Sequence, residues 1–319
     1  MRASCTLAAM RLLPPAAVVY IGVFFTSFSS IFVRSSDAPA VVAAMYRMWF
    51  SVFLLLPVLA GQRIRAANIK GNPPSESLIN PPAKPAPADW GLCVVSGFFL
   101  AVHFWVWFES LKLTSITSST VLVNTNPIFV LIFGFLLLKE RVSLKGVAFV
   151  LIAVAGIATL SFGDFSRGMD TLAGDLLAIV SAAAVAGYLL IGRKVRRNMD
   201  ALTYVVLVYF VAAICLTVLT ISRGISLFDY EAHDYLMFAG MAFFCTLLGH
   251  TLFNWALKYL KTSLIATTVL MEPVFATILG ILIFKEIPGW ITGVGGFVVL
   301  IGIFLFVREE GKPLKNKRR

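Results

Sequence analysis

The sequence predicts an all-α integral membrane protein whose ten transmembrane helices form two inverted five-helix repeats. Three observations predict this class: the composition, a series of long apolar stretches, and an internal repeat. Of the 319 residues, 59% are apolar and 13% are charged, and the mean hydropathy is +0.89. Because a soluble domain carries about 25% charged residues, the composition excludes that class.

Ten stretches are apolar enough to cross a bilayer, for which a helix needs roughly 20 mostly apolar residues. The first follows Arg2 and Arg11 and continues to Arg34 without a small-residue cleavage pattern, so we expect a span and not a signal peptide. The predicted limits are 15–33, 40–60, 89–109, 116–138, 145–162, 173–192, 202–222, 235–257, 264–284 and 288–307.

The positive charge lies mainly on one side of the predicted membrane. Ten spans place both termini on one side, which holds 21 of the 27 Lys and Arg residues, against five on the other side and Arg47 within a span. Positively charged loops stay in the cytoplasm, so both termini are predicted to be cytoplasmic. The surplus favours contact with anionic lipids. Binding to nucleic acid is not expected, because the polar segments contain no basic stripe with interleaved aromatic residues.

Residues 61–88 form the one long polar stretch between spans, and they contain six prolines. Such a segment cannot bury a core, so we expect a flexible cytoplasmic linker. The predicted division is a first repeat over 1–162, which includes this linker, and a second repeat over 163–319, which ends in a basic cytoplasmic tail.

The internal repeat appears when the chain is aligned with itself at an offset of 146 residues. Proline, glycine and Lys-Glu positions coincide: Pro127 with Pro273, Gly134 with Gly280, Lys139-Glu140 with Lys285-Glu286, and Gly156 with Gly302. Each half holds five spans, and an odd number gives the halves opposite orientations. We therefore expect a binding site near the midplane, where the halves meet, and an alternating-access mechanism.

Several segments carry a family resemblance. They are Tyr46-Arg47-Met48 leading to Leu56-Pro57, "HFWVWFESLKLTSITSSTVLVNTNPIF" (103–129), "LLLKER" (136–141), "LLGHTLFNWALKYL" (247–260) and "LMEPVFATILGILIFKE" (270–286). The chain resembles the drug/metabolite transporter superfamily, specifically its ten-helix EamA-like permeases, over nearly its whole length. The resemblance implies an inner-membrane carrier of the cell, often an exporter of amino acids or other small metabolites, with a central cavity.

Ionisable side chains deep in a span are functional candidates, because each costs roughly 2.5–3.5 kcal/mol on insertion scales. Glu272 precedes Pro273, which is expected to kink its span. We expect Glu272 to bind a cationic substrate group or an exchanged proton; the alternative is a hydrogen bond that fixes helix packing. Arg47 can hold a substrate carboxylate; the alternative is a structural role, paired with Glu272 or with helix-end carbonyls.

Polar residues also mark predicted faces of the cavity. His103 with Trp107, and His250 with Asn254, are four residues apart and so share a helical face. Asn126 aligns with Glu272 in the repeat, whereas Asn124 lies roughly 200° away on a continuous helix and is expected to face elsewhere. Tyr46 and Tyr188 are predicted aromatic walls. The predicted substrate-binding set is Arg47, Tyr46, His103, Trp107, Asn126, Tyr188, His250, Asn254 and Glu272.

Small residues predict close helix contacts. Gly289 and Gly293 form a GxxxG pattern, and Ala178, Ala182 and Ala186 form a stripe. Packing within the chain is the preferred interpretation and a dimer face the alternative, so we expect a monomer.

The leading functional hypothesis is a secondary active transporter of small metabolites. The sequence contains no P-loop, so direct use of ATP is not expected. It also lacks an HExxH, GxSxG or paired-aspartate pattern that would indicate an enzyme. The cysteines and histidines do not have the spacing of metal ligands, so no cofactor is expected. The alternatives are a facilitative channel or a lipid-handling protein of the same fold, and, further off, an intramembrane enzyme. Substrate identity and coupling ion do not follow from these residues.

Overall fold

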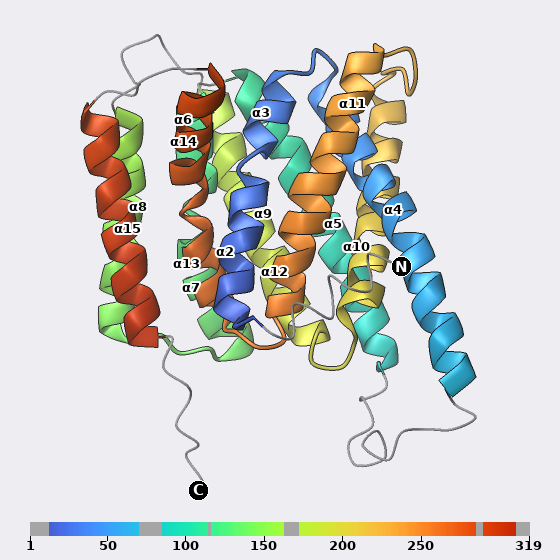
Figure 1. The fold of residues 1–319 in the computed structure, drawn as a ribbon, viewed down its shortest axis with the longest axis horizontal. Coiled ribbons are helices and arrows are strands. Elements are labelled where there is room, and N and C mark those ends of the chain that lie inside the picture. Colours follow the sequence, from blue (N-terminus) through green and yellow to red (C-terminus); the bar gives the residue numbers. More distant parts are fainter. Residues whose placement is uncertain (1–12, 70–84, 114–115, 163–171, 285–289, 311–319) are drawn as a thin grey trace, which may run out of the picture.

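The computed structural model describes residues 13–69, 85–113, 116–162, 172–284 and 290–310. All regular elements within these ranges are helices, and they lie side by side in one bundle (Figure 1). The predicted all-helical class is confirmed. The predicted basic tail and most of the predicted linker lie outside the described residues.

Within the described residues, each predicted apolar stretch forms one helix or consecutive helices. The first half contains α2 (Pro15–Thr26), α3 (Ser29–Arg34), α4 (Ala40–Ile69), α5 (Pro87–Leu113), α6 (Ile116–Val123), α7 (Asn126–Leu138) and α8 (Leu144–Phe162). The second half contains α9 (Leu172–Val195), α10 (Ala201–Ser222), α11 (Ala232–Gly240), the π-helix η3 (Met241–His250), α12 (Thr251–Ala256), α13 (Thr262–Val269), α14 (Glu272–Phe284) and α15 (Trp290–Glu310).

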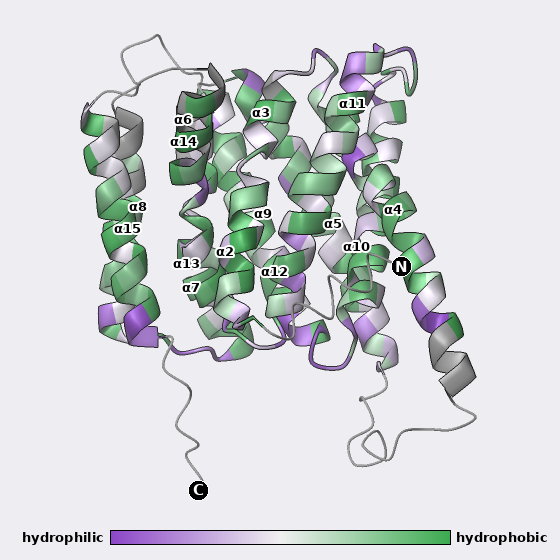
Figure 2. Ribbon diagram, in the orientation of Figure 1, coloured by the Kyte–Doolittle hydropathy of each residue, from purple (hydrophilic) through white to green (hydrophobic). Residues whose placement is uncertain are grey.

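The hydropathy of the bundle is that of a multi-pass membrane protein. Within the described ranges, six helical stretches are long and apolar enough to cross a membrane: 15–33, 40–64, 87–113, 172–195, 201–222 and 232–256. Shorter apolar helices occupy 126–138, 144–156 and 262–275. Apolar residues dominate the middle of the bundle, and polar residues gather at its two ends (Figure 2). The count of ten spans and the inverted arrangement stay predictions.

Helix α4 extends further than the sequence predicted. It continues to Ile69, so residues 61–69 are helical and do not belong to a flexible linker. The prediction was wrong because it equated the end of the apolar stretch with the end of the helix. Arg, Ala and Gln are good helix formers, so a polar segment prolongs the helix beyond the apolar region.

Two predicted spans are broken in the middle. Helix α6 ends at Val123 and α7 begins at Asn126, while α13 ends at Val269 and α14 begins at Glu272. A proline is the second residue after each break, where its missing N–H costs nothing and its ring prevents the preceding turn from continuing the helix. The predicted kink before Pro273 is therefore a full interruption.

The helix limits follow the internal repeat. All four limits of α6 and α7 coincide with those of α13 and α14 when 146 is added to the residue number. This agreement supports a structural duplication that the sequence offset predicted.

Helices α8 and α15, which are also related by the offset, cross in close contact through two glycines. A Cβ added to Gly156 would lie 2.6 Å from the Val299 nitrogen, and one added to Gly302 would lie 2.6 Å from the Ala153 nitrogen. Gly293, by contrast, faces open space, so it does not pack within the chain as predicted, and Gly289 lies outside the described residues. The alanine stripe on α9 is completely buried, as predicted.

Candidate functional site

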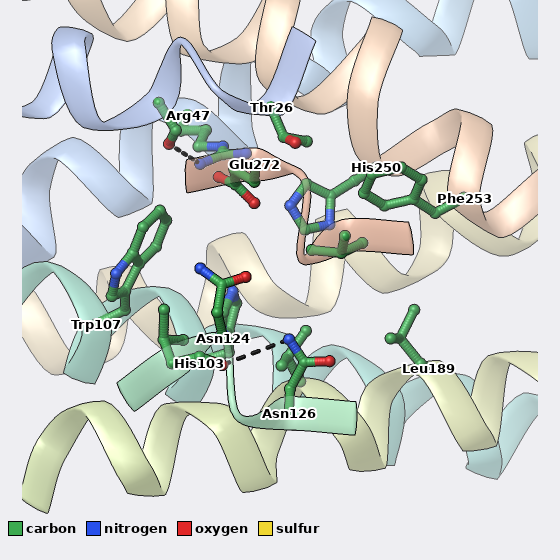
Figure 3. A pocket seen from close by; sticks show the side chains of 14 residues that line it. Thr26, Arg47, His103, Trp107, Asn124, Asn126, Leu189, His250, Phe253 and Glu272 are labelled. Carbon is green, nitrogen blue, oxygen red and sulfur yellow. Dashed lines mark hydrogen bonds between the residues drawn. The ribbon is translucent and has the colours of Figure 1, made fainter. Parts of the chain in front are cut away.

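A cavity lies in the middle of the bundle, where both broken spans are interrupted (Figure 3). Its volume is about 50 Å³, room for only a few water molecules, since one needs about 10–15 Å³ by this measure. Both halves of the chain line it. The lining residues are Thr26, Ser29, Arg47, His103, Trp107, Val123, Asn124, Asn126, Val185, Leu189, His250, Phe253, Val269 and Glu272.

The helix breaks supply the amides and the carboxyl group of the cavity. Asn126 and Glu272 are the first residues of α7 and α14, as their alignment in the repeat predicted. Asn124, which the sequence placed on another face, lines the same cavity. That prediction was wrong because it assumed a continuous helix, whereas the chain changes direction between Asn124 and Asn126.

Arg47 on α4 is fully buried and held by three elements. Its Nε donates to Thr246 Oγ1 at 2.8 Å, its Nη1 donates to Ser29 Oγ at 3.0 Å, and its Cζ lies 4.2 Å from the centroid of the Phe104 ring. These contacts fix the plane of the guanidinium. The second terminal nitrogen, Nη2, has no hydrogen-bond partner among the described residues.

Glu272 faces the cavity on the same side as Arg47 (Figure 3). Among the ion pairs of the described residues, none joins these two side chains. The direct salt bridge that the sequence allowed is therefore not formed in this conformation, although the two opposite charges attract each other at longer range.

His103 on α5 is oriented by Ser181 of α9. The His103 Nδ1 lies 2.8 Å from Ser181 Oγ and 3.3 Å from the Ser181 carbonyl oxygen. A carbonyl oxygen only accepts, so the hydrogen is assigned to Nδ1 and Nε2 is left as an acceptor. The Ser181 hydroxyl in turn donates to the His103 carbonyl oxygen at 3.1 Å.

His250 is the last residue of the π-helix η3, a helix type that often occurs at functional sites. Its ring packs against Phe104 at a centroid distance of 5.3 Å and lies 6.4 Å from the His103 ring. Its Nδ1 has no hydrogen-bond partner in the described part of the chain. The π-helix thus carries both Thr246, which holds Arg47, and His250, which lines the cavity.

The cavity lining combines unpartnered donors and acceptors. Arg47 Nη2 and Trp107 Nε1 can only donate, and Asn126 Oδ1 can only accept; within the described residues these buried atoms lack hydrogen-bond partners. A buried polar group without a partner costs about 1–3 kcal/mol. A polar ligand with both an acceptor and a donor group would remove this cost.

Six of the nine predicted site residues line the cavity: Arg47, His103, Trp107, Asn126, His250 and Glu272. The other three pack nearby. The Tyr46 hydroxyl donates to the Leu227 carbonyl oxygen at 2.7 Å. Asn254 donates through Nδ2 to the Tyr188 hydroxyl and to the His250 carbonyl oxygen. Whether any of the nine contacts substrate stays a prediction.

Several lining residues were not predicted as site residues. Thr26 and Ser29 come from the break between α2 and α3, and the apolar residues are Val123, Val185, Leu189, Phe253 and Val269. No signal in the sequence separates these residues from other small or apolar side chains in the spans.

A polytopic helical bundle with a polar cavity at the meeting point of two halves has the architecture of a membrane carrier. The profile of the EamA-like transporter family matches residues 13–162 and 172–308. The chain belongs to this family and is a membrane transporter, and the resemblance to the drug/metabolite transporter superfamily is confirmed.

Relatives named as transporters or solute carriers agree with this assignment. An uncharacterized transporter of Archaeoglobus fulgidus is 27% identical over 240 residues, which cover 72% of this chain and 80% of that protein. Solute carrier family 35 member G1 of Homo sapiens is 26% identical over 298 residues, which cover 88% of this chain and 75% of that protein.

A solved crystal structure, one of several similar to this chain, shares the fold. It matches 93% of this chain and 98% of its own, with a TM-score of 0.70 and 16% sequence identity. At this identity the match shows the fold alone.

Proposed function

We propose that this protein is a secondary active transporter in the cell (inner) membrane, with both termini cytoplasmic, that exports small polar or amphipathic metabolites by alternating access. Amino acids are the first class to test. A family of transporters and a cavity between the two halves support the general mechanism.

The observation that carries the proposal is the pairing of opposite polar functions in one small cavity. Arg47 Nη2 and Trp107 Nε1 suit a carboxylate, while Glu272 and Asn126 Oδ1 suit an ammonium group. An α-amino acid carries both groups on one carbon atom. The apolar lining residues Val123, Leu189 and Val269 suit its side chain.

The size of the cavity favours a carrier over a channel. A volume of about 50 Å³ is too small for a metabolite, so substrate entry requires helix movement. A carrier makes such a movement in every cycle, whereas an open channel does not.

The test is flux in proteoliposomes. A thermal-shift screen of amino acids, polyamines, nucleosides and sugar phosphates selects the ligand, and its radiolabelled form is then followed with and without unlabelled ligand on the opposite side. We expect saturable uptake that countertransport stimulates. Linear, non-saturating flux would support the channel alternative and contradict the carrier.

A further inference from the structure

Two buried aspartates occupy corresponding positions in the two halves. Asp89 is the third residue of α5 and Asp234 is the third residue of α11, and each is only 5% exposed. Their sequence separation is within one residue of the repeat offset. Helices α5 and α11 begin at opposite ends of the bundle, so the aspartates lie at opposite ends as well (Figure 1).

Each aspartate holds a turn that belongs to the other half. Asp89 Oδ2 accepts from Asn198 Nδ2 at 3.1 Å, and Asn198 lies between α9 and α10. Asp234 Oδ1 accepts from Ser36 Oγ at 2.7 Å and from the Asp37 N–H at 3.1 Å, in the turn between α3 and α4. Asp37 and Asn198 are each the third residue before the helix that follows, so the two arrangements match in topology.

Hydrogen bonds provide the compensation that the structure gives these carboxylates. Among the ion pairs of the described residues, none involves Asp89 or Asp234. Hydrogen bonds to ionised groups are stronger than neutral ones. If a turn moved away, water could replace the lost hydrogen-bond donors of the aspartate. Each contact can therefore break and form again once water reaches its end of the bundle.

Both contacts lie beyond the cavity, towards the two surfaces. Ser36 follows the lining residue Ser29 by seven residues, and Asn198 follows the lining residue Leu189 by nine. Helix α3 continues for five residues after Ser29 and α9 for six after Leu189, so at 1.5 Å per helical residue at least about 7–9 Å separates each contact from the cavity along the helix axis.

We propose that Asp89 and Asp234 form two symmetry-related latches, the Asp89 latch (Asp89 with Asn198) and the Asp234 latch (Asp234 with Ser36 and Asp37). Each latch closes one end of the bundle, and release of one at a time opens the cavity to one side. The structure has both latches closed. This inference rests on the proposed alternating access.

The test measures access to the cavity and uses no substrate, so its result is independent of whether amino acids are transported. Leu189→Cys supplies a reporter thiol in the cavity of a chain whose Cys5, Cys93, Cys215 and Cys245 are replaced by alanine. A membrane-impermeant maleimide is added to vesicles whose C-terminal tag faces either outward or inward. Helix α15 ends at the same end of the bundle as the Asp89 latch, so the tag reports orientation.

We expect Asn198→Ala to accelerate labelling about fivefold or more from the side of the tag, with little change from the other side. Ser36→Ala and Asp234→Ala are expected to do so from the opposite side, and Asp234→Ala more strongly because it removes both hydrogen bonds. Ser36→Ala keeps the test valid if Asp234→Ala does not fold.

Two matched controls separate the latches from simple helix-end effects. Asp200→Ala removes a carboxylate whose hydrogen bond, from the Thr203 N–H at 3.0 Å, stays within the start of α10. Glu231→Ala removes the N-cap residue of α11, which makes no side-chain cap hydrogen bond. Labelling by the latch variants that does not exceed these controls, or that rises equally from both sides, would overturn the proposal.

Discussion

The guanidinium carbon of Arg47 lies 4.2 Å from the centre of the Phe104 ring. Phe104 therefore covers one face of the only buried arginine that lines the cavity within the described residues. A planar cation can stack on an aromatic face and still donate in its plane. Thr246 and Ser29 accept two of these donors and leave Nη2 unpartnered.

Replacement of Arg47 by lysine tests this geometry. Arg47→Lys keeps the charge but cannot satisfy Thr246 and Ser29 and still offer a planar donor to a carboxylate. We expect the apparent affinity for an amino acid to fall about tenfold or more, the equivalent of roughly 1.4 kcal/mol, in counterflow assays. The matched control is Arg63→Lys, since Arg63 is exposed and donates to Thr203 Oγ1. Equal affinities for Arg47→Lys and the parent protein would assign Arg47 a packing role only.

Glu272→Gln tests the proposed proton role. Glutamine fills the same space but cannot release a proton, so substrate-driven proton movement is expected to disappear while the protein stays folded. The measurement is the internal pH of proteoliposomes, reported by a dye after substrate addition. Glu109→Gln is the control, because Glu109 pairs with Arg223 near a helix end and away from the cavity. Unchanged proton movement in Glu272→Gln would refute the role.

Two carboxyl groups at the helix ends are expected to give opposite pH dependences of stability. Burial raises the pKa of Glu140, and Arg193 and Lys261 oppose this only in part. For Glu310, burial acts in the same direction, but hydrogen bonds from Lys261 Nζ and the Ser143 N–H lower its pKa overall. The contribution of Glu140 to the stability of the folded protein is full below its ordinary pKa of 4.5. This contribution is lost as the pH rises through the folded-state pKa.

The sign is reversed for Glu310, whose contribution is full above its ordinary pKa of 4.5 and is lost as the pH falls through its folded-state pKa. At about pH 7, Glu140→Gln is therefore expected to raise Tm and Glu310→Gln to lower it, each by about 2 °C. Both differences should shrink in acid. Thermal unfolding in detergent across this pH range checks the two signs, and shifts in the same direction would contradict the assignment.

Alanine at Gly156 is expected to destabilise the protein. Its Cβ would lie 2.6 Å from the Val299 nitrogen and 3.0 Å from the Gly295 oxygen, which are backbone atoms that cannot rotate away. We expect a loss of about 1–3 kcal/mol in unfolding free energy, as for other overpacked sites. Gly302→Ala should behave alike. Gly293→Ala is the control: its Cβ would meet nothing within 4 Å, so no loss is expected there.

The extent of the helices followed well from the sequence, and their interruptions followed in part. Apolar stretch length fixed nearly every helix limit, since burial in lipid and helix formation act on the same residues. Pro273 indicated one of the two breaks, and the repeat places Pro127 at the equivalent position of the other. The end of α4 could not be predicted in this way, because polar residues with high helix propensity continue the helix beyond the apolar stretch.

The candidate site followed less completely. Ionisable residues were easy to find because they are rare in apolar spans. Asn124 was missed because an angular argument fails across a helix break. Asn254 shares a helix face with His250, but residue spacing does not show how far along that face the cavity extends. Asn254 hydrogen-bonds to Tyr188 instead. The π-helix η3 has no sequence signal of its own, yet it orients Thr246 and His250.

The crossing of α8 and α15 limits which motions the protein can make. At Gly156 and Gly302 the two backbones approach so closely that neither glycine has room for a Cβ. We therefore expect α8 and α15 to move together, although they belong to different halves of the chain. Opening of the cavity then depends on hinge motion elsewhere, and the breaks after Val123 and Val269 are the natural pivots.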